Sequence, residues 1–484
     1  MPSTNHIIQF YHGNRFTELD LSVYNLSPTT TVLKYLRETL HETGTKEGCA
    51  EGDCGACTVV IAESDELNQL HFNAVNSCLM FLPQLHGKQL ITIENIGNEH
   101  DLHPVQKAIV ENNASQCGFC TPGFVMSLYA LYKTPDELDD ESIKAATAGN
   151  LCRCTGYKSI LTAARQALSG KSTDFFSEHE RSVASKLNAI LENRLPLYIE
   201  NSGNKYFVAK TLDDALEFIK NNPEATIVSG STDIALKVTK KHERIPVILD
   251  ISYINELKQI NATSKSIYIG SGVNIENVRR SCNTAFPALS EMLKVFGSQQ
   301  IRHKATLGGN IGSASPIGDT LPVLMAYDAS VILISKQGER KIPIRSFITS
   351  YRTTLTLPGE LIKGVEINIL SPDIKVNAYK ISKRRQVDIS TLSAAFRHYI
   401  DSNNIIKEFD VWYGGMAAVP KHASLTCEFL RGKLLTPELV KAAMEKIAGD
   451  FVPISDARAS STGRLIMAKN LLMKFFNEIL NQNK

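Results

Sequence analysis

Eight of the ten cysteines in this 484-residue chain lie in its first third. Three of them share one loop, Cys49-Ala-Glu-Gly-Asp-Cys-Gly-Ala-Cys57, and Cys78 follows later in the chain. A loop that folds several thiolates around one centre must curl tightly, so its backbone needs φ angles that glycine adopts without strain. Gly48, Gly52 and Gly55 are expected to supply that freedom. The stretch therefore predicts a metal centre held by four thiolates.

Two kinds of metal centre use four cysteines. The spacing Cys-x4-Cys-x2-Cys with a distant fourth cysteine is that of a plant-type [2Fe–2S] cluster, whose potential is tuned by nearby hydrogen bonds. A structural zinc site also takes four cysteines, but its usual spacing is two short pairs. The set Cys49, Cys54, Cys57 and Cys78 favours the cluster, and zinc stays open on this stretch alone.

A second set of cysteines follows as two short pairs, Cys117-Gly-Phe-Cys120 and Cys152-Arg-Cys154. Thr121-Pro122 predicts a helix start directly after the first pair, with threonine as the cap and proline at the first helical position. Helix N-termini favour thiolates and the net negative charge of a cluster. Because Cys-x-Cys is a poor zinc knuckle, this set argues against zinc, and two loops at one end of a bundle could enclose one binuclear cluster.

Hydrophobic periodicity indicates the elements that carry these cysteines. Before residue 100 it predicts a small mixed sheet with one helix, formed by strands at Ile7–Tyr11, Phe16–Val23, Val59–Ala62 and Leu90–Ile96 and a helix at Thr31–Leu40. The residues His12-Gly13-Asn14 predict a turn with positive φ between the first two strands. From Pro104 onward the pattern becomes helical, with helices at 105–110, 121–132, 141–148 and 159–168. A small helical bundle should therefore carry the second cysteine set.

The remainder of the chain mixes strands and helices. Residues 169–197 are predicted to be a linker, with a helical turn or two at Val183–Leu191. Strands are expected at Thr226–Val228, Pro246–Asp250, Ser266–Ile269, Asn377–Ser382 and Phe409–Tyr413, and helices at Thr436–Ala448 and Gly463–Leu480. The fold class is therefore multidomain α+β.

Two glycine-containing loops in this part could bind a nucleotide. Thr226–Ile234 runs from a strand through Gly230 to a helix start, where successive backbone N–H groups could cradle a pyrophosphate without a Walker lysine. Such turns are common, and alone this one would more often be structural. In the second loop, Thr306–Asp319, glycines and Asn310 allow close backbone approach to a ligand, and Asp319 could accept a sugar hydroxyl.

Composition limits the class of protein. The formal net charge is +2, with 43% hydrophobic and 21% charged residues, so neither nucleic acid nor an anionic membrane is an expected partner. No apolar run has the length of a signal peptide or a membrane span, so a cytoplasmic location is expected. In that compartment the cysteines should be ligands or buried thiols rather than disulfides, and Cys282 and Cys427 are interpreted as structural.

The flanks of the second cysteine set carry a family resemblance. Gln116-Cys-Gly-Phe-Cys-Thr-Pro-Gly123 and Cys152-Arg-Cys-Thr-Gly-Tyr157 resemble the iron–sulfur part of the molybdenum hydroxylases, the xanthine dehydrogenase family. The resemblance implies that each cysteine set binds one [2Fe–2S] cluster. It implies that the set Cys117, Cys120, Cys152 and Cys154 faces a molybdenum cofactor and the first set faces a flavin. Gln116 would then contact the pterin of that cofactor, which lies in a partner domain.

Both glycine-containing loops resemble the FAD-binding loops of the same family. The resemblance implies that the first holds the pyrophosphate, through Thr226, Ile227, Val228, Ser229, Gly230, Ser231, Thr232 and Asp233. In the second, Thr306, Gly309, Asn310, Ser315 and Asp319 would line the flavin nucleotide. Phe296, Ile362 and Lys380 match further FAD contacts through short motifs, and ordinary core packing is the alternative for Phe296 and Ile362. A basic loop, Lys383–Asp388, matches a segment beside the flavin, but Gln386 and Val387 stand where relatives often have acidic residues.

The resemblance extends over nearly the whole chain, from about residue 6 to residue 480. It implies a ferredoxin-like β-grasp [2Fe–2S] domain (1–92), a helical-bundle [2Fe–2S] domain (93–168), the linker (169–197), an α+β FAD-binding domain (198–370) and a C-terminal α+β flavoprotein domain (371–484). The chain looks like the small subunit of a bacterial two-subunit xanthine dehydrogenase. A large molybdenum-cofactor-binding subunit is then the expected partner, in a heterotetramer of two small and two large subunits.

In that assembly no residue of this chain would catalyse substrate hydroxylation. Electrons from oxidation of hypoxanthine or xanthine to urate would pass from molybdenum through the second cysteine set and the first to FAD, and then to NAD+ or oxygen. Two alternatives stay open. The same architecture could serve another molybdenum hydroxylase that acts on aldehydes or N-heterocycles, or the chain could be a non-enzymatic zinc scaffold.

Overall fold

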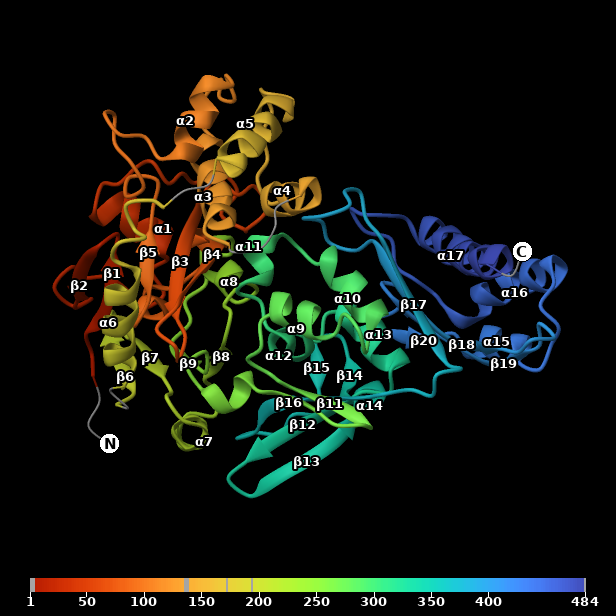
Figure 1. Cartoon of the computed structure of the whole chain (residues 1–484). Helices are drawn as coiled ribbons and strands as arrows, with labels where there is room; N and C mark the ends of the chain where they lie inside the picture. Colours follow the sequence, from red (N-terminus) through yellow and green to blue (C-terminus); the bar gives the residue numbers. More distant parts are fainter. Residues whose placement is uncertain (1–4, 135–138, 171–172, 193–194, 483–484) are drawn as a thin grey trace. The chain divides into compact units, whose positions relative to one another are not determined.

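The computed structural model describes residues 5–134, 139–170, 173–192 and 195–482, which are drawn in Figure 1. The chain forms two compact units, and each is described by itself. The first comprises Met1–Asn255 and Gly297–Ala305, and the second comprises Glu256–Phe296 and Thr306–Lys484. In the described part of the chain, no helix combines the length and the apolar character needed to cross a bilayer.

The first unit opens with the expected ferredoxin-like fold, a mixed five-stranded sheet in the order β2-β1-β5-β3-β4. The strands are β1 (Ile8–His12), β2 (Arg15–Leu19), β3 (Thr58–Ser64), β4 (Leu70–Asn76) and β5 (Gln89–Ile91). Strand β1 pairs parallel with β5, and the other pairs are antiparallel. Helix α1 (Val32–Lys34) continues as a π-helix over Tyr35–Thr39.

Two predicted strands are shorter than expected, for the same physical reason. Strand β2 ends at Leu19 because Asp20 Oδ1 accepts hydrogen bonds from the N–H and the hydroxyl of Ser22. Strand β5 ends at Ile91 because Asn95 Oδ1 accepts from the N–H of Thr92. Such short side chains offer the backbone a turn in place of a ladder hydrogen bond. The predicted strand ends at Val23 and Ile96 were therefore wrong.

The helical part of the first unit is the expected bundle, formed by α2 (Pro104–Glu111), α3 (Thr121–Tyr132), α4 (Asp140–Thr147) and α5 (Lys158–Ser169). Helix α3 is buried on nearly every side because α2, α4, α5 and strand β3 pack around it. The predicted start of α3 is one residue late. Cys120 is the N-cap and Thr121 the first helical residue, because the Thr121 hydroxyl is hydrogen-bonded to Ser115 Oγ.

The stretch predicted to hold a helical turn or two contains a full helix, α6 (Glu180–Glu192). Its Val183 and Leu187 pack against Tyr11 of β1, which gives the helix a buried face that its mixed composition conceals. A second sheet follows, in the order β6-β7-β9-β8. It consists of β6 (Leu197–Asn201), β7 (Asn204–Val208), β8 (Thr226–Val228) and β9 (Val247–Asp250), with helices α7 (Leu212–Asn221) and α8 (Ala235–Thr239).

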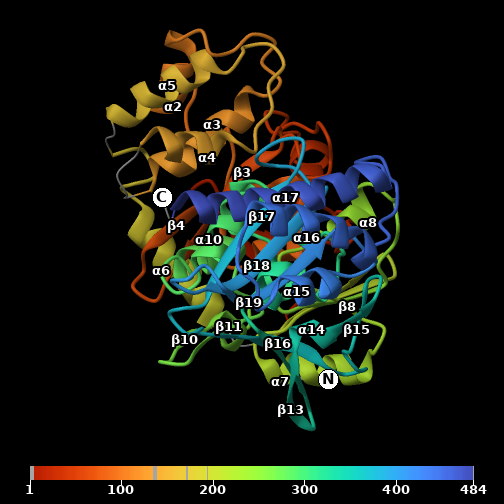
Figure 2. The same cartoon turned by 90° about the vertical axis from the view of Figure 1, so that its right-hand side faces the viewer.

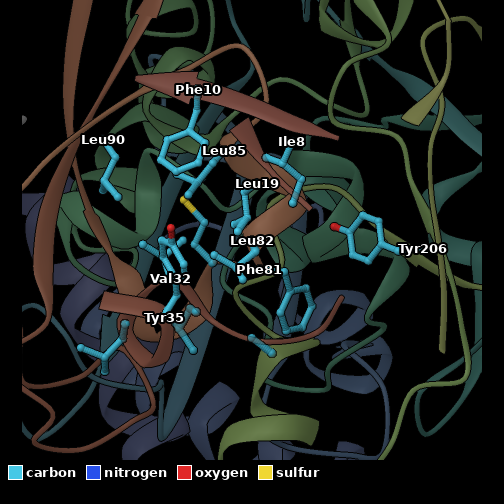
Figure 3. Close-up of a cluster of buried hydrophobic side chains, with 14 of the residues drawn as sticks. Ile8, Phe10, Leu19, Val32, Tyr35, Phe81, Leu82, Leu85, Leu90 and Tyr206 are labelled. Atoms are coloured by element: carbon cyan, nitrogen blue, oxygen red, sulfur yellow. The ribbon is translucent and has the colours of Figure 1, made fainter. Parts of the chain in front are cut away.

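One hydrophobic core joins the two sheets of the first unit (Figure 3). Ile8 and Phe10 of β1 and Val32 of α1 contribute to it from the ferredoxin-like part. Tyr206 of β7 and Val228 of β8 belong to the same buried cluster. The loop that follows β8 is therefore anchored to the core on which the first cysteine loop also rests.

The second unit contains an antiparallel sheet in the order β10-β11-β16-β12-β13. Its strands are β10 (Ile260–Ala262), β11 (Ser266–Gly270), β12 (Ser330–Ser335), β13 (Gly338–Pro343) and β16 (Leu361–Asn368). The helices in this part of the unit are α9 (Ile275–Ser281), α10 (Pro287–Lys294), α12 (Leu307–Gly312), α13 (Thr320–Ala326) and α14 (Ile344–Phe347), and β14 (Ile348–Ser350) pairs with β15 (Thr353–Thr354). Helix α11 (Gln299–Arg302) belongs to the first unit.

The C-terminal part of the second unit is a four-stranded sheet covered by helices. Strands β17 (Lys375–Ile381), β18 (Leu392–Ile400), β19 (Ile406–Gly414) and β20 (Lys421–His422) pair antiparallel in that order. Helices α15 (Ser424–Leu430), α16 (Pro437–Asp450) and α17 (Ser461–Gln482) follow, and Figure 2 shows α16 and α17 lying across the strands. Phe396 and Phe475 stack at 4.6 Å between the sheet and α17.

Candidate cluster and flavin sites

The first cysteine loop takes its shape from three different backbone devices. Gly52 and Gly55 have φ angles of +78° and +70°, as expected for a tight curl. Gly48 serves another purpose, because an added Cβ would lie 2.8 Å from Cys54 Sγ. Ala50 takes a positive φ of +55° that the sequence did not signal. Gly48 therefore provides space for a sulfur and not a left-handed turn.

The sulfur atoms of this set lie in pairs. Cys57 Sγ is 3.3 Å from Cys78 Sγ, and the thiols of Cys49 and Cys54 lie within hydrogen-bonding reach of each other. Two thiolates bound to one tetrahedral metal at about 2.3 Å stand roughly 3.8 Å apart. All four thiols are free of disulfide bonds. The residues therefore fit two tetrahedral irons, each with two protein sulfurs.

The loop backbone favours the anionic form of one sulfur. Cys49 Sγ accepts hydrogen bonds from the N–H groups of Glu51, Asp53 and Cys54 at 3.3–3.4 Å. The hydrogen bond from the Cys54 thiol, followed by these N–H groups, lowers the pKa of Cys49 to about 5, against the opposing effect of burial. A zinc or iron ligand must be a thiolate, and these hydrogen bonds favour that form of Cys49.

The second cysteine set repeats this pairing at the helix ends. Cys117 Sγ and Cys154 Sγ are 3.6 Å apart, and the thiols of Cys120 and Cys152 lie within hydrogen-bonding reach of each other. Cys120 is the N-cap of α3. Burial opposes ionisation of Cys152, but hydrogen bonds from the hydroxyl and the N–H of Thr155 lower its pKa. Four thiols from two loops thus meet at one end of the bundle, as expected.

Solvent exposure distinguishes the two sets. Cys57 and Cys78 are 2% and 1% exposed, whereas Cys117 and Cys154 are classed among the exposed residues of the chain. Gln116, which precedes Cys117, is exposed as well. Cys117, Cys154 and Gln116 therefore lie at the surface of the first unit, and Cys120 and Cys152 are half-buried.

A buried amide network, which the sequence did not signal, connects the two cysteine loops. Asn150 is 2% exposed, and its Nδ2 donates to the Gly55 carbonyl at 3.1 Å. Its Oδ1 accepts from Ser127 Oγ at 2.7 Å and from Gln300 Nε2 at 3.1 Å. Gln300 lies on α11, 150 residues further along the chain. Only the folded chain brings these polar side chains together.

The backbones of the two loops also meet directly. The Leu151 N–H donates to the Cys54 carbonyl at 3.0 Å, and Leu151 directly precedes Cys152. The approach requires glycine on both sides. A Cβ added to Gly55 would lie 2.2 Å from the Gly149 carbonyl oxygen. A Cβ added to Gly123 would lie 2.2 Å from the Gly55 carbonyl oxygen. Cys54, from the first set, thus accepts this hydrogen bond, and Cys152, from the second set, directly follows its donor.

The first glycine-containing loop leads from β8 to α8, as predicted. Ser231, rather than a glycine, holds the left-handed position with a φ of +60°. Gly230 is needed for packing, because an added Cβ would lie 1.8 Å from the Lys304 carbonyl. Ser231 Oγ donates to the Leu79 carbonyl at 2.5 Å, and Gln84 Nε2 donates to the Ser229 carbonyl at 2.9 Å. These bonds fix the loop to the segment that follows Cys78.

Six of the eight residues predicted for this loop are half-buried or exposed. Val228 is 1% exposed and belongs to the core, whereas Ile227 is 37% exposed. Thr226, Ser229, Gly230 and Thr232 are half-buried, Asp233 is exposed, and Ser231 is 5% exposed. The first helical hydrogen bond runs from the Ala235 N–H to the Ser231 carbonyl, so the loop forms a helix N-terminus, which favours an anion. The backbone of the loop therefore fits a phosphate group, whereas the side chains of Val228 and Ser231 are buried.

The second glycine-containing loop forms the short helix α12 with Thr306 as its N-cap, where Thr306 Oγ1 accepts from the Gly309 N–H at 3.1 Å. Its adjacent glycines have different roles. An added Cβ on Gly308 would meet Ser271 at 2.4 Å, whereas one on Gly309 would meet only Thr306 Oγ1, at 3.0 Å. Gly308 therefore serves packing, and Gly309 leaves room for a ligand, as a nucleotide site requires. Asn310 is held by Thr320, whose Oγ1 donates to its Oδ1 at 2.6 Å.

Asp319 and Lys380, both predicted to contact FAD, form a buried ion pair. Lys380 Nζ donates to Asp319 Oδ2 at 2.7 Å and to the Val295 carbonyl at 3.0 Å, with side-chain exposures of 5% for the lysine and 8% for the aspartate. Ser390 Oγ donates to the other carboxylate oxygen at 2.5 Å. A carboxylate offers about four lone-pair sites, so a sugar hydroxyl remains a possible further donor.

The other predicted residues of the second unit lie near these elements. Phe296 follows α10 and is half-buried, as is Ile362 of β16. The side chain of Ile362 lies 3.3 Å from the position of an added Cβ on Gly312 of α12. Ser315 accepts at its carbonyl from the Gly318 N–H. In the basic loop Lys383–Asp388, Val387 has a left-handed φ of +57°, which is uncommon for a β-branched residue.

Asp410, His422 and Cys427 place their ligand atoms within 4.8 Å of one another in the second unit. The carboxylate is already paired, because Asp410 Oδ1 accepts from His422 Nε2 at 2.8 Å and from Arg431 Nη2. Burial raises the pKa of the Cys427 thiol to about 12, which disfavours the thiolate a metal needs. This group is an ion pair beside a structural cysteine.

Comparison with protein families matches the chain domain by domain. A 2Fe-2S iron-sulfur cluster binding domain matches residues 21–82, and a [2Fe-2S] binding domain matches residues 92–165. An FAD binding domain in molybdopterin dehydrogenase matches residues 200–368, and a CO dehydrogenase flavoprotein C-terminal domain matches residues 377–479. The cofactors of the chain are therefore [2Fe–2S] clusters and FAD.

Curated relatives cover nearly all of this chain. It is 30% identical to xanthine dehydrogenase of Emericella nidulans, over 98% of this chain and 39% of the relative. It is 32% identical to xanthine dehydrogenase of Drosophila subobscura (97% and 38%) and 31% identical to xanthine dehydrogenase/oxidase of Gallus gallus (97% and 39%). The chain thus spans about two fifths of the length of these relatives.

Solved structures share the fold of part of the chain. Carbon monoxide dehydrogenase from Hydrogenophaga pseudoflava is 20% identical, with a TM-score of 0.53 over 58% of this chain and 96% of that one. Quinoline 2-oxidoreductase from Pseudomonas putida 86 is 20% identical, with a TM-score of 0.53 over 56% and 95%. The resemblance inferred from the cysteine flanks is confirmed: this chain belongs to the molybdenum hydroxylase family and carries its iron–sulfur and FAD-binding domains.

Proposed function

We propose that the chain is the electron-transfer component of a xanthine dehydrogenase and works with a separate molybdenum-cofactor-binding subunit. Cys49, Cys54, Cys57 and Cys78 hold one [2Fe–2S] cluster, and Cys117, Cys120, Cys152 and Cys154 hold the other. When bound, the two clusters and FAD carry electrons from the molybdenum cofactor, through the second set and then the first, to NAD+. The sequence identity of 30–32% between this chain and several xanthine dehydrogenases supports this proposal.

One observation carries the proposal of a relay rather than two isolated metal sites. The Leu151 N–H donates to the Cys54 carbonyl, so a ligand of the second set, Cys152, is one residue from a hydrogen bond to a ligand of the first. A scaffold protein with two zinc sites has no need for such a link. Asn150, two residues before Cys152, supports this contact through hydrogen bonds with Gly55 of the first loop and Ser127 of α3.

The chain's own residues perform binding and positioning. The N–H groups of Glu51, Asp53 and Cys54 stabilise negative charge at Cys49 Sγ. Residues 226–233 of the first unit and Thr306, Gly309, Asn310, Ser315 and Asp319 of the second are proposed to bind FAD, with Phe296, Ile362 and Lys380. The exposed Gln116 is proposed to contact the pterin of the partner subunit. No residue of this chain is proposed to act on the purine.

Analysis of the purified protein tests the proposal. We expect four irons, four labile sulfides and one FAD per chain, and two distinct [2Fe–2S] signals in electron paramagnetic resonance (EPR) spectra after reduction. A colourless protein that contains zinc and no flavin would overturn it. Co-purification with the molybdenum subunit, followed by assays with xanthine, an aldehyde and an N-heterocycle, identifies the substrate class. NAD+ and oxygen as alternative acceptors identify the electron exit.

A further inference from the structure

A lysine from the nucleotide-binding part of the first unit reaches the first cysteine loop. Lys240 follows α8 directly and caps its C-terminus, with its N–H donating to the Leu236 carbonyl. Leu236 and Val238 of α8 pack against the core that contains Cys57 and Cys78. The helix is therefore docked on the base of the cysteine loop, and the position of Lys240 is fixed by packing.

The ammonium group of Lys240 makes two contacts with the loop. Its Nζ donates to the carbonyl of Cys49, a proposed iron ligand, at 3.2 Å, and it lies 3.5 Å from Glu51 Oε2. The Glu51 N–H in turn donates to Cys49 Sγ at 3.4 Å. The lysine side chain is 45% exposed and the glutamate side chain 43%. One cation and one anion thus lie at the same cysteine ligand.

As a stabilising ion pair this contact would contribute little, because exposed pairs add almost nothing to folding free energy. Its position gives it a different effect. The potential of a [2Fe–2S] cluster depends on its net charge, on hydrogen bonds and on solvent exposure. Reduction adds one negative charge to a centre that four thiolates already make negative. A fixed ammonium group therefore favours the reduced state, and a carboxylate disfavours it.

We propose that Lys240 raises the reduction potential of the cluster held by Cys49, Cys54, Cys57 and Cys78, and offsets the opposing charge of Glu51. The inference rests on the proposed function of this cysteine set. The step concerned is the transfer of one electron, which oxidises the cluster of the second set and reduces that of the first, with no bond or proton transferred. Lys240 thereby favours transfer of the electron to the cluster of the first set.

The expected size follows from the exposure of the pair. At partial exposure the interaction lies between the weak limit of water and the stronger limit near a protein surface. We expect Lys240→Met to lower the equilibrium constant for one-electron reduction roughly three- to tenfold, which is about 30–60 mV for a one-electron couple. Glu51→Gln should shift the potential in the opposite direction. Both shifts should shrink at high ionic strength, because salt screens exposed charges.

The neighbouring lysine provides a matched control. Lys241→Met makes the same change in net charge, but Lys241 Nζ pairs with Glu243 Oε1 at 3.8 Å and not with Glu51. Potentials are measured on the full chain by redox titration with EPR detection, which resolves the two clusters. We expect the first cluster to shift in Lys240→Met and to keep its parental potential in Lys241→Met. The second cluster, an internal control, should stay unchanged in both.

Several results would overturn the inference. They are an unshifted first cluster in Lys240→Met, an equal shift in Lys241→Met, or an equal shift of both clusters. Lys240→Gln removes the charge and keeps a hydrogen-bond donor. If Lys240→Met loses iron, the potential of the first cluster is measured in Lys240→Gln instead. Loss of iron from both variants would make the lysine structural and the inference wrong. Absence of any [2Fe–2S] signal from the parent chain would overturn the proposed function itself, whereas intact signals with unshifted potentials contradict only this inference.

Discussion

Replacement of Asn150 by alanine tests the buried contact between the two cysteine loops. The side chain makes four hydrogen bonds, to Gly55, Thr58, Ser127 and Gln300. The substitution removes all of them from a site that is 2% exposed. Water has little access to the groups left behind, so the cost includes their unmet hydrogen bonds as well as the lost contacts.

The magnitude follows from the individual bonds. Each contributes about 0.5–1.5 kcal/mol net, and a buried group left without a partner costs more. Ser127 Oγ and Gln300 Nε2 remain hydrogen-bonded to each other at 2.9 Å, which limits the loss. We expect Asn150→Ala to lower the free energy of unfolding of the first unit by about 3 kcal/mol. For a unit of this size that corresponds to a fall in Tm of roughly 6–12 °C.

Thermal unfolding followed by visible circular dichroism reports the cluster environments directly. The control is Asn112→Ala, since Asn112 donates to Ala108 and Gln166 at the surface of the helical part. We expect this control to lower the Tm by less than a quarter of the effect at Asn150. A Tm of Asn150→Ala within 2 °C of the parent, with both cluster spectra unchanged, would refute the assignment of this amide as the link between the loops.

Three further changes test other parts of the chain. Cys154→Ser should alter the EPR signal of the second cluster while FAD stays near one per chain, and loss of flavin would contradict independent sites. Lys380→Met leaves the carboxylate of Asp319 buried without its cation. The free energy of unfolding of the second unit, measured by denaturant titration, should therefore fall by about 3–5 kcal/mol, and the FAD content should fall. Lys380→Met combined with Asp319→Asn should recover part of the lost stability. Burial, and then Lys375, lower the pKa of His398 from 6.5 to about 4. Stability is therefore full above pH 6.5 and decreases as pH falls toward 4, by at most about 3 kcal/mol, and His398→Gln should flatten this dependence while His100→Gln at the surface leaves it unchanged.

The cysteine sets could be predicted because their chemistry is local. Thiolate spacing and flanking glycines determine how a short loop can curl around a metal, and Gly52 and Gly55 have the predicted positive φ angles. Helices α3 and α5 follow their cysteine pairs as their periodicity indicated. The multidomain α+β fold class follows from the periodicity and the family resemblance, and the comparisons bear it out.

Features that depend on distant residues could not be predicted. Gln300 meets Asn150 only after α11 returns to the first unit, and no local pattern identifies it as a partner. Strand β18, Leu392–Ile400, contains two alanines and a histidine, and its strand character comes from pairing with β17 and β19 on both sides. Strand ends at Leu19 and Ile91 depend on side chains of Asp20 and Asn95 that compete with the ladder.

The contrast in burial between the two cysteine sets has a consequence for biogenesis. Cys57 and Cys78 are buried within the core shared by the two sheets of the first unit, whereas Cys117 and Cys154 are exposed. A scaffold protein that donates a preassembled cluster can reach the surface thiols of a folded chain, but it can reach Cys57 and Cys78 only before the sheet closes. The two sites should therefore differ in when they can receive a cluster. We expect the ferredoxin-like site to take up its cluster during folding, and the helical site to stay accessible to cluster transfer, or to repair after oxidative damage, once folding is complete.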